Sequence, residues 1–175
     1  MPLGRVLAEW HDFFLLVGTA GATLVALLFV AASLGVGYLT AEGAIGTRTF
    51  MTPVVIHFAA VFFISAVSLV PSIAPPFFAG VIGAAALVGI GVSIFVMFMV
   101  LTSSMTQDNF DRLAYGILPA IGYIAVLSGA ALVYFEKEWA IDVLGGALLL
   151  LAIVNIRNGW DLTLSMVRRH ARPER

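Results

Sequence analysis

The chain has 175 residues, of which 61% are hydrophobic and 11% are charged, and its formal net charge at pH 7 is −1. Soluble domains carry about 25% charged residues, so this composition excludes a soluble globular domain and predicts an integral membrane protein. The small net charge gives no reason to expect a nucleic-acid partner. The lack of cysteine excludes a disulfide framework, a thiolate nucleophile and cysteine metal ligands.

The first apolar run, residues 13–36, contains no charged residue and is long enough to span a bilayer. Its length and the acidic flank "LAEWHD" are not those of a cleavable signal peptide. We expect residues 2–12 to form a short helix at the membrane interface. A polar connection is expected to follow, through Tyr38, Glu42 and Arg48.

Residues 49–107 contain no Asp, Glu, Lys or Arg. One continuous helix of that length would be much longer than a bilayer is thick. The motif "VPSIAPPF" disfavours helix at Pro71, Pro75 and Pro76. The stretch therefore predicts two spans, residues 51–71 and 77–102, joined by a short stiff turn.

The last part of the chain predicts two more spans. A polar loop, "LTSSMTQDNFDRL", leads to a fourth span over residues 114–135, in which Pro119 is expected to cause a mild kink. The turn "EKE" separates it from a fifth span over residues 139–160, which we expect to continue as helix towards the basic tail, residues 167–175. The predicted fold is one all-α transmembrane domain, residues 1–175, with a bundle of five helices.

The distribution of basic residues predicts the orientation of the bundle. With five spans, seven of the nine basic residues fall on the side of the C-terminus, and Arg5 and Lys137 fall on the other. The positive-inside rule then places the C-terminus in the cytoplasm and the N-terminus outside. Trp10, Trp139 and Trp160 lie at predicted span ends, where interface aromatics belong.

A polar cluster lies in the last turns of the fifth span, in "NIRNGWDLTLSM". Arg157 and Asp161 are four residues apart on a helix, close enough to pair, and Asn155 and Asn158 share another face. Arg157 can also reach the lipid headgroups. We favour a role in ending and anchoring the span over a vestibule or docking site built on the same residues.

His57 is the one histidine well inside a predicted span, about two turns from its start. Its depth is similar to that of Asn155 and Asn158, so a hydrogen bond between the second and fifth spans is geometrically allowed. We favour a neutral histidine that holds two helices together over a pH-sensitive gate or proton relay, because a single buried histidine has few ways to pass on a proton.

Small residues recur at intervals of four along three spans, a pattern that lets helix backbones approach closely in lipid. It predicts close packing within the bundle, between subunits, or both, at Gly18, Ala22, Ala26, Gly80, Gly83, Ala125 and Gly129. No two histidines lie at the same depth in the predicted bundle, as two haem ligands in one chain would have to. No acid, base and nucleophile are spaced so that they would come together in one site. We therefore expect no catalytic residues, no metal and no cofactor.

The segments "HDFFLLVGTAGATLVALLFVAASL", "TPVVIHF" and "NIRNGWDLTLSMV", about half the chain, resemble a group of small bacterial multi-pass membrane proteins. Some members of that group carry an automatic label as modulators of a membrane-bound protease. The resemblance implies a location in the bacterial inner membrane. It implies no established activity, and no residue role is transferred from it.

The sequence thus favours a non-enzymatic accessory or assembly subunit, which packs against itself or against a larger membrane complex. The alternative is a homo-oligomeric channel or carrier for an ion or small solute, with His57 and the polar cluster near its cytoplasmic mouth. The poverty of polar residues inside the predicted spans favours the subunit. The expected partners are the lipid bilayer and either further copies of this chain or other membrane subunits.

Overall fold

The computed structural model describes the backbone of residues 3–36, 41–102 and 113–170, and the side chains of residues 3–33, 51–99 and 114–164. All of the described elements are helical. They are α1 (Leu3–Glu9), α2 (His11–Val36), α3 (Ala41–Ser68), α4 (Pro75–Thr102), the π-helix η1 (Leu113–Ile117), α6 (Leu118–Tyr134) and α7 (Ala140–His170).

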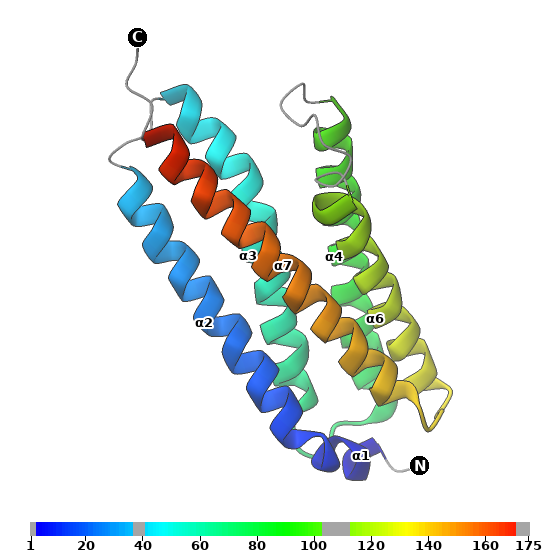
Figure 1. The fold of residues 1–175 in the computed structure, drawn as a ribbon. Coiled ribbons are helices and arrows are strands. Elements are labelled where there is room, and N and C mark those ends of the chain that lie inside the picture. The colour runs from blue at the N-terminus through cyan, green and yellow to red at the C-terminus, as the bar shows by residue number, and fades with distance from the viewer. Residues whose placement is uncertain (1–2, 37–40, 103–112, 171–175) are drawn as a thin grey trace.

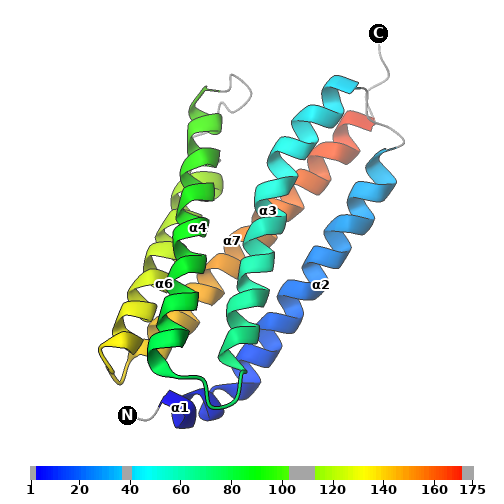
Figure 2. The same cartoon turned by 180° about the vertical axis from the view of Figure 1, so that it is seen from behind.

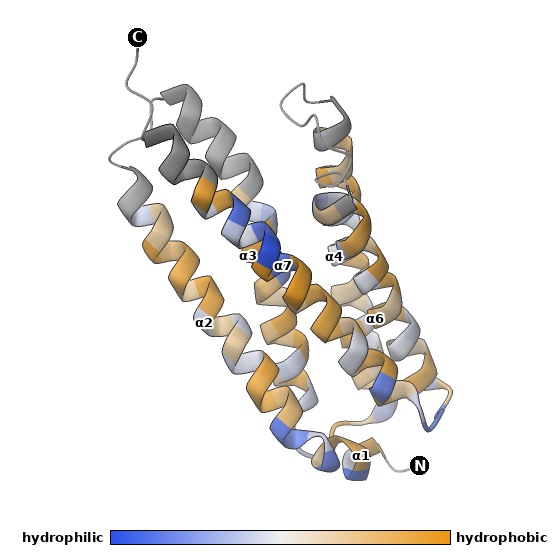
Figure 3. Cartoon of the chain, in the orientation of Figure 1, coloured by the Kyte–Doolittle hydropathy of each residue, from blue (hydrophilic) through white to orange (hydrophobic). Residues whose placement is uncertain are grey.

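Five helices are long and apolar enough to cross a membrane, so the predicted all-α structure with five potential spans is confirmed over the described residues. Their apolar segments run over His11–Ser33, Met51–Ser68, Pro75–Met99, Ala114–Tyr134 and Ala140–Leu164. Figure 3 shows hydrophobic residues along most of each helix, hydrophilic residues at the end near the N-terminus, and a hydrophilic patch partway along α7. The first helix, α1, and the last turns of α7 lie at opposite ends of the bundle, as an odd number of spans requires (Figure 1).

Two turns at the end near the N-terminus reverse the chain as predicted. Between α3 and α4, Ser72 has a φ of 55°, and α4 begins at Pro75, where a proline costs no helical hydrogen bond. Between α6 and α7, Glu136 has a φ of 53°. There the Glu136 N–H donates to the Val133 carbonyl and the Lys137 N–H donates to the Leu132 carbonyl, which is a Schellman cap.

The helix boundaries differ from the expected ones at two places. α3 begins at Ala41, so residues 41–48 are helical where a connection was expected, and Pro53 lies inside the helix. The fourth span opens with the π-helix η1 instead of a mildly kinked α-helix. As expected, α7 continues as helix beyond the fifth span, to His170. The expected loop over residues 103–112, Tyr38, and the tail from residue 171 lie outside the described residues.

The helices form two arms that α7 connects. The first arm contains α2, α3 and the second half of α7, and the second arm contains α4, η1 and α6 (Figures 1 and 2). α7 begins against α6, where Gly129 faces Leu144, and ends against α2 and α3, where Gly159 faces Leu28 and Val54. We call the end of the bundle near the C-terminus the C-side and the opposite end the N-side.

The apolar core differs between the two sides. On the N-side, one large cluster joins all the long helices with α1, whose Leu3, Val6 and Leu7 are buried against the base of the bundle. The expected short helix at the N-terminus is therefore present, and it packs on the protein. On the C-side, the described side chains form two small clusters, one in each arm.

Candidate functional site

The buried polar side chains on the C-side lie between the two arms, and we call this set the polar seam. It comprises the buried side chains of His57 on α3, Tyr115 on η1, Tyr123 on α6, and Asn155 and Asn158 on α7. The exposed Asp161 on α7, which the Tyr115 hydroxyl contacts, completes it at the edge. His57, Asn155 and Asn158 are 2%, 0% and 1% exposed. Buried polar groups are costly without hydrogen bonds, so the partners of each side chain define the site.

His57 bonds to the fourth span. Its Nδ1 and the Tyr123 hydroxyl share a buried hydrogen bond of 2.8 Å, whose direction depends on the imidazole tautomer. A hydrogen bond from His57 to the fifth span was geometrically allowed by the sequence, but the bond in the structure links the second span to the fourth. The bond connects α3 in the first arm with α6 in the second, so His57 does join two helices.

The start of the fourth span explains one role of Asn158. In a π-helix, the carbonyl of Ala114 would accept from the nitrogen of Pro119, which carries no hydrogen. Asn158 Nδ2 instead donates to the Ala114 carbonyl at 2.9 Å. A side chain on α7 thus satisfies a carbonyl that the proline leaves without a helical donor.

Tyr115 makes a second connection between η1 and α7. Its hydroxyl lies 3.0 Å from Asp161 Oδ2 and 3.2 Å from the Asn158 carbonyl oxygen, and its single hydrogen can serve either acceptor. Arg157 lies beside this contact: its Nη1 donates to Asn158 Oδ1 at 3.2 Å, and its Cζ is 5.7 Å from the centre of the Tyr115 ring. The predicted cluster therefore faces the second arm.

Asn155 is the least satisfied member of the seam. Its Nδ2 donates to the Leu151 carbonyl at 2.7 Å, one turn earlier on α7. Its Oδ1 is buried and has no hydrogen-bond partner among the described residues; the same holds for Ser65 Oγ in the N-side half. A buried carbonyl oxygen without a donor marks a place where a small donor would be stabilised.

The predicted packing residues divide into two groups. A Cβ atom at Gly18 would lie 3.0 Å from Ser65 Cβ, and one at Gly129 would lie 3.3 Å from Leu144 Cβ, so both glycines bring helices together within the chain. Gly83 touches Leu127 more loosely, and Ala125 is half-buried. The remaining three face outwards on the single chain: Ala22, Ala26 and Gly80.

The closest helix approaches involve glycines that the spacing of four did not select. A Cβ atom at Gly89 would overlap the Tyr123 ring, and one at Gly122 would overlap Leu151. Gly145 lies under the ring of Trp10, which also packs edge-to-face on Phe13 at 5.1 Å. Trp10 is therefore part of the base of the bundle.

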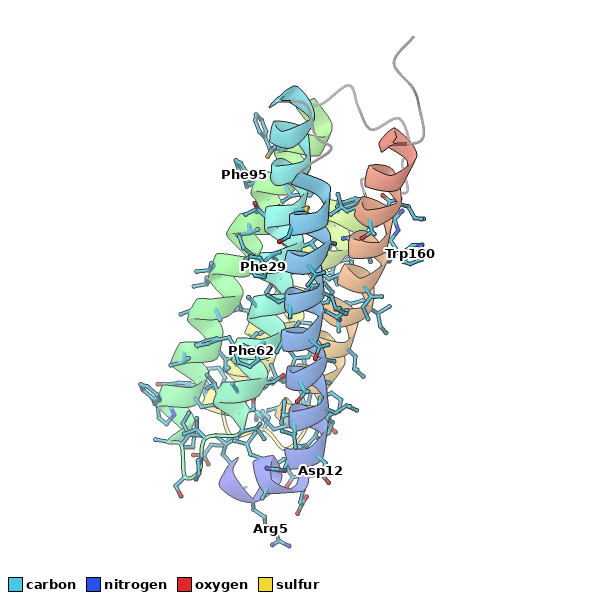
Figure 4. The ribbon with its side chains drawn as sticks, turned by 90° about the vertical axis from the view of Figure 1, so that its left-hand side faces the viewer. Arg5, Asp12, Phe29, Phe62, Phe95 and Trp160 are labelled. Carbon is cyan, nitrogen blue, oxygen red and sulfur yellow. The ribbon has the colours of Figure 1, made fainter. Side chains whose placement is uncertain are left out.

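The exposed aromatic residues point away from the bundle. Trp139 and Trp160 are 56% and 65% exposed, as interface anchors require. Figure 4 shows Phe29, Phe95 and Trp160 projecting outwards from α2, α4 and α7. Tyr115 and Tyr123 are members of the seam that were not predicted from the sequence. The available signal was a pair of phenol hydroxyls eight residues apart in an apolar span, since buried hydroxyls need partners.

Within the part of the chain that the structure describes, no three His, Cys, Asp or Glu side chains are grouped so that they could hold a metal ion. Comparison of the chain with protein-family models, curated proteins and solved structures finds no match. The functional conclusions therefore depend on the residues and their contacts.

Proposed function

We propose that this chain is a multi-pass protein of the bacterial inner membrane that acts as an accessory or assembly subunit. Its N-terminus lies outside and its C-terminus in the cytoplasm. It binds copies of itself or a larger membrane complex through the outer faces of α2 and α4. The excess of basic residues on the C-side supports this orientation.

The outward-facing small residues carry the proposal. Ala22 and Ala26 on α2, and Gly80 and Ala84 on α4, are exposed on the single chain. A Cβ atom at Gly80 would meet nothing within 4 Å. A glycine inside a helix costs about 1 kcal/mol relative to alanine, and no contact with the described residues offsets that cost at Gly80. Close approach of a partner helix would offset it.

The test replaces the two small residues on α4, Gly80→Leu with Ala84→Leu, and measures assembly by native mass spectrometry of protein extracted with its own lipids. We expect the assembled species to be lost, because the larger side chains hold a partner helix away. The matched control is Gly146→Leu on α7, an exposed glycine with open space around it but with no small residue four positions away. We expect it to leave assembly intact, because it does not belong to a stripe of small residues. Assembly that survives the double substitution would refute the role of the α4 face.

The substitution Gly18→Leu does not test assembly. Gly18 lies against Ser65 within the chain, so a leucine there separates α2 from α3 and perturbs the fold of each copy. Ala22→Leu with Ala26→Leu tests the outer face of α2 instead.

The polar seam favours a second candidate function, a channel or carrier for an ion or small solute. Its hydrogen bonds lie inside the apolar segments and connect the two arms, which is where a translocation site needs polar groups. This candidate predicts a pH-dependent flux across vesicles that His57→Ala abolishes. Equal flux in the variant and the natural chain would remove His57 from the mechanism.

A further inference from the structure

The contacts between the two arms differ in kind along the bundle. On the N-side, both arms share one apolar cluster, to which α3 contributes Val61 and Ile64, α4 contributes Phe78, and α6 contributes Val126. On the C-side, Leu28, Val54, Phe58 and Leu162 pack within the first arm. Val96 and Tyr115 form a separate cluster in the second. Among the described side chains, apolar packing therefore holds the arms together on the N-side only.

Hydrogen bonds take the place of apolar packing between the arms on the C-side. They are the bond between His57 and Tyr123, the donation from Asn158 Nδ2 to the Ala114 carbonyl, and the contact of the Tyr115 hydroxyl with Asp161. Figures 1 and 2 both show the C-side end of α4 standing apart from those of α2, α3 and α7. Hydrogen bonds can be exchanged for water at small net cost, whereas apolar contacts cannot.

The closed arrangement also leaves one group unsatisfied in the seam itself. Asn155 Oδ1 is buried and has no donor among the described side chains and backbone. Separation of the arms would admit water, which donates to such an oxygen. The π-helix is a second weak point in the hydrogen bonding of the C-side, because the Ala114 carbonyl at its start depends on the Asn158 side chain for a donor. π-helical turns recur at functional sites.

The geometry points to a two-state bundle, whose C-side opens between the arms while the N-side core acts as the hinge. The contacts of Tyr115 and Asn158 form the latch that holds the closed state. The open state admits water as far as Asn155. This inference does not depend on the assembly proposed above, because a single chain contains every residue involved.

The absence of native cysteine makes the opening measurable with spin labels. One cysteine pair reports the distance between the arms on the C-side, Val30→Cys on α2 with Phe95→Cys on α4. A second pair reports the N-side, Leu16→Cys with Phe77→Cys on the same two helices. All four positions are exposed, so the labels do not disturb the core. Distances are measured by pulsed electron resonance in lipid nanodiscs.

The latch variant combines Tyr115→Phe with Asn158→Leu. We expect the distance distribution of the C-side pair to gain a longer component, displaced by at least about 5 Å, the pitch of one helical turn. The N-side pair should not change. The control is Ser128→Ala, which removes a hydrogen bond within α6 and outside the seam, and it should leave both pairs as they are. An unchanged C-side pair, or an equal displacement of both pairs, would overturn the inference.

A second measurement tests the entry of water. Asn155→Cys and Ser65→Cys place thiols at two equally buried positions, one in the seam and one in the N-side core. Reaction with a charged, water-soluble thiosulfonate should be faster at Asn155→Cys. The latch substitutions should accelerate it roughly tenfold, the change that a hydrogen bond of about 1.4 kcal/mol produces in an opening equilibrium. Ser65→Cys should remain unreactive in both backgrounds; equal reactivity at the two positions would show general loosening and refute the hinge.

Discussion

The contact between Gly89 and Tyr123 gives the sharpest prediction about stability. A Cβ atom added at Gly89 would lie 2.2–2.4 Å from three atoms of the Tyr123 ring, which no real contact allows. The ring is fully buried and its hydroxyl is bonded to His57, so it has no free space to move into. Gly89→Ala must therefore displace the ring and strain or break its hydrogen bond.

The expected size of the effect follows from three contributions. The higher helix propensity of alanine stabilises the variant by about 1 kcal/mol relative to glycine. Overpacking of a buried site costs about 1–3 kcal/mol. Loss of the buried hydrogen bond costs a further 1–3 kcal/mol or so, because a polar group is left without its partner. We expect Gly89→Ala to lower the free energy of unfolding by about 1–5 kcal/mol.

Unfolding in mixed detergent micelles, followed by circular dichroism, measures this difference. The control is Gly80→Ala in the same helix, where open space surrounds the new atom; it should leave the stability of the single chain unchanged or raise it by up to about 1 kcal/mol. In a Tyr123→Leu background the penalty of Gly89→Ala should disappear. A Gly89→Ala chain as stable as the natural one would refute the contact.

Three further predictions concern single contacts, and unfolding in micelles checks each. Tyr123→Phe keeps the ring and leaves His57 without its partner, and we expect a loss of about 1–3 kcal/mol. Glu136→Gly should raise stability by about 1 kcal/mol, because glycine adopts the positive φ of the Schellman cap without strain; a loss would show that the Glu136 side chain stabilises the turn. Trp10→Ala removes the ring that covers Gly145 and should cost about 2 kcal/mol, whereas no change would show that α1 does not brace the bundle.

The number and approximate extent of the long helices follow from the sequence for a simple reason. Apolar runs of about 20 residues have few alternatives to a helix, and the prolines at 71 and 75 end one run and begin the next. The same criterion missed the first ten residues of α3, since Ala41–Phe50 contains Glu42 and Arg48. Hydropathy detects the part of a helix that is apolar and says little about its polar ends.

The packing of the helices was predictable only in part, because spacing does not determine the crossing angle of two helices. Gly18 was expected to share a packing face with Ala22. In the structure the residue that faces α3 together with Gly18 is Gly21, where an added Cβ atom would lie 3.2 Å from the Phe58 carbonyl oxygen. A shift of one residue rotates the contact by about 100° around the helix. Ala22 is thereby turned outwards.

The partner of His57 could not be predicted for a related reason. Its depth restricted the candidates to side chains at the same level, and Asn155 and Asn158 met that condition. Tyr123 met it too. A tyrosine in an apolar span is usually read as an apolar aromatic residue, because the sequence does not show where its hydroxyl points. Which helix lies beside α3 at that level depends on how α7 crosses between the arms.

Asn155 and Asn158 provide a matched pair that tests the seam. They lie three residues apart on α7 and are equally buried, but Asn158 Nδ2 satisfies the Ala114 carbonyl and Asn155 Oδ1 has no donor. Replacing Asn158 by leucine removes one hydrogen bond from the Ala114 carbonyl and one from the Arg157 guanidinium. Replacing Asn155 by leucine removes an oxygen that has no donor in the closed fold. It also removes the bond from Asn155 Nδ2 to the Leu151 carbonyl, but that carbonyl lies inside α7, where the helix backbone can supply a donor.

The two substitutions change the side-chain volume by the same amount, so a similar cost of overpacking contributes to the stability of both variants. The difference between their free energies of unfolding therefore reports the hydrogen bonds. We expect Asn158→Leu to be less stable than Asn155→Leu by about 1–3 kcal/mol in the micelle unfolding assay. In the spin-label measurement, Asn155→Leu should narrow the C-side distance distribution, since the open state loses the oxygen that water hydrates. Equal stabilities would mean that Asn158 does not hold the π-helical start of the fourth span, and the latch would lose its main residue.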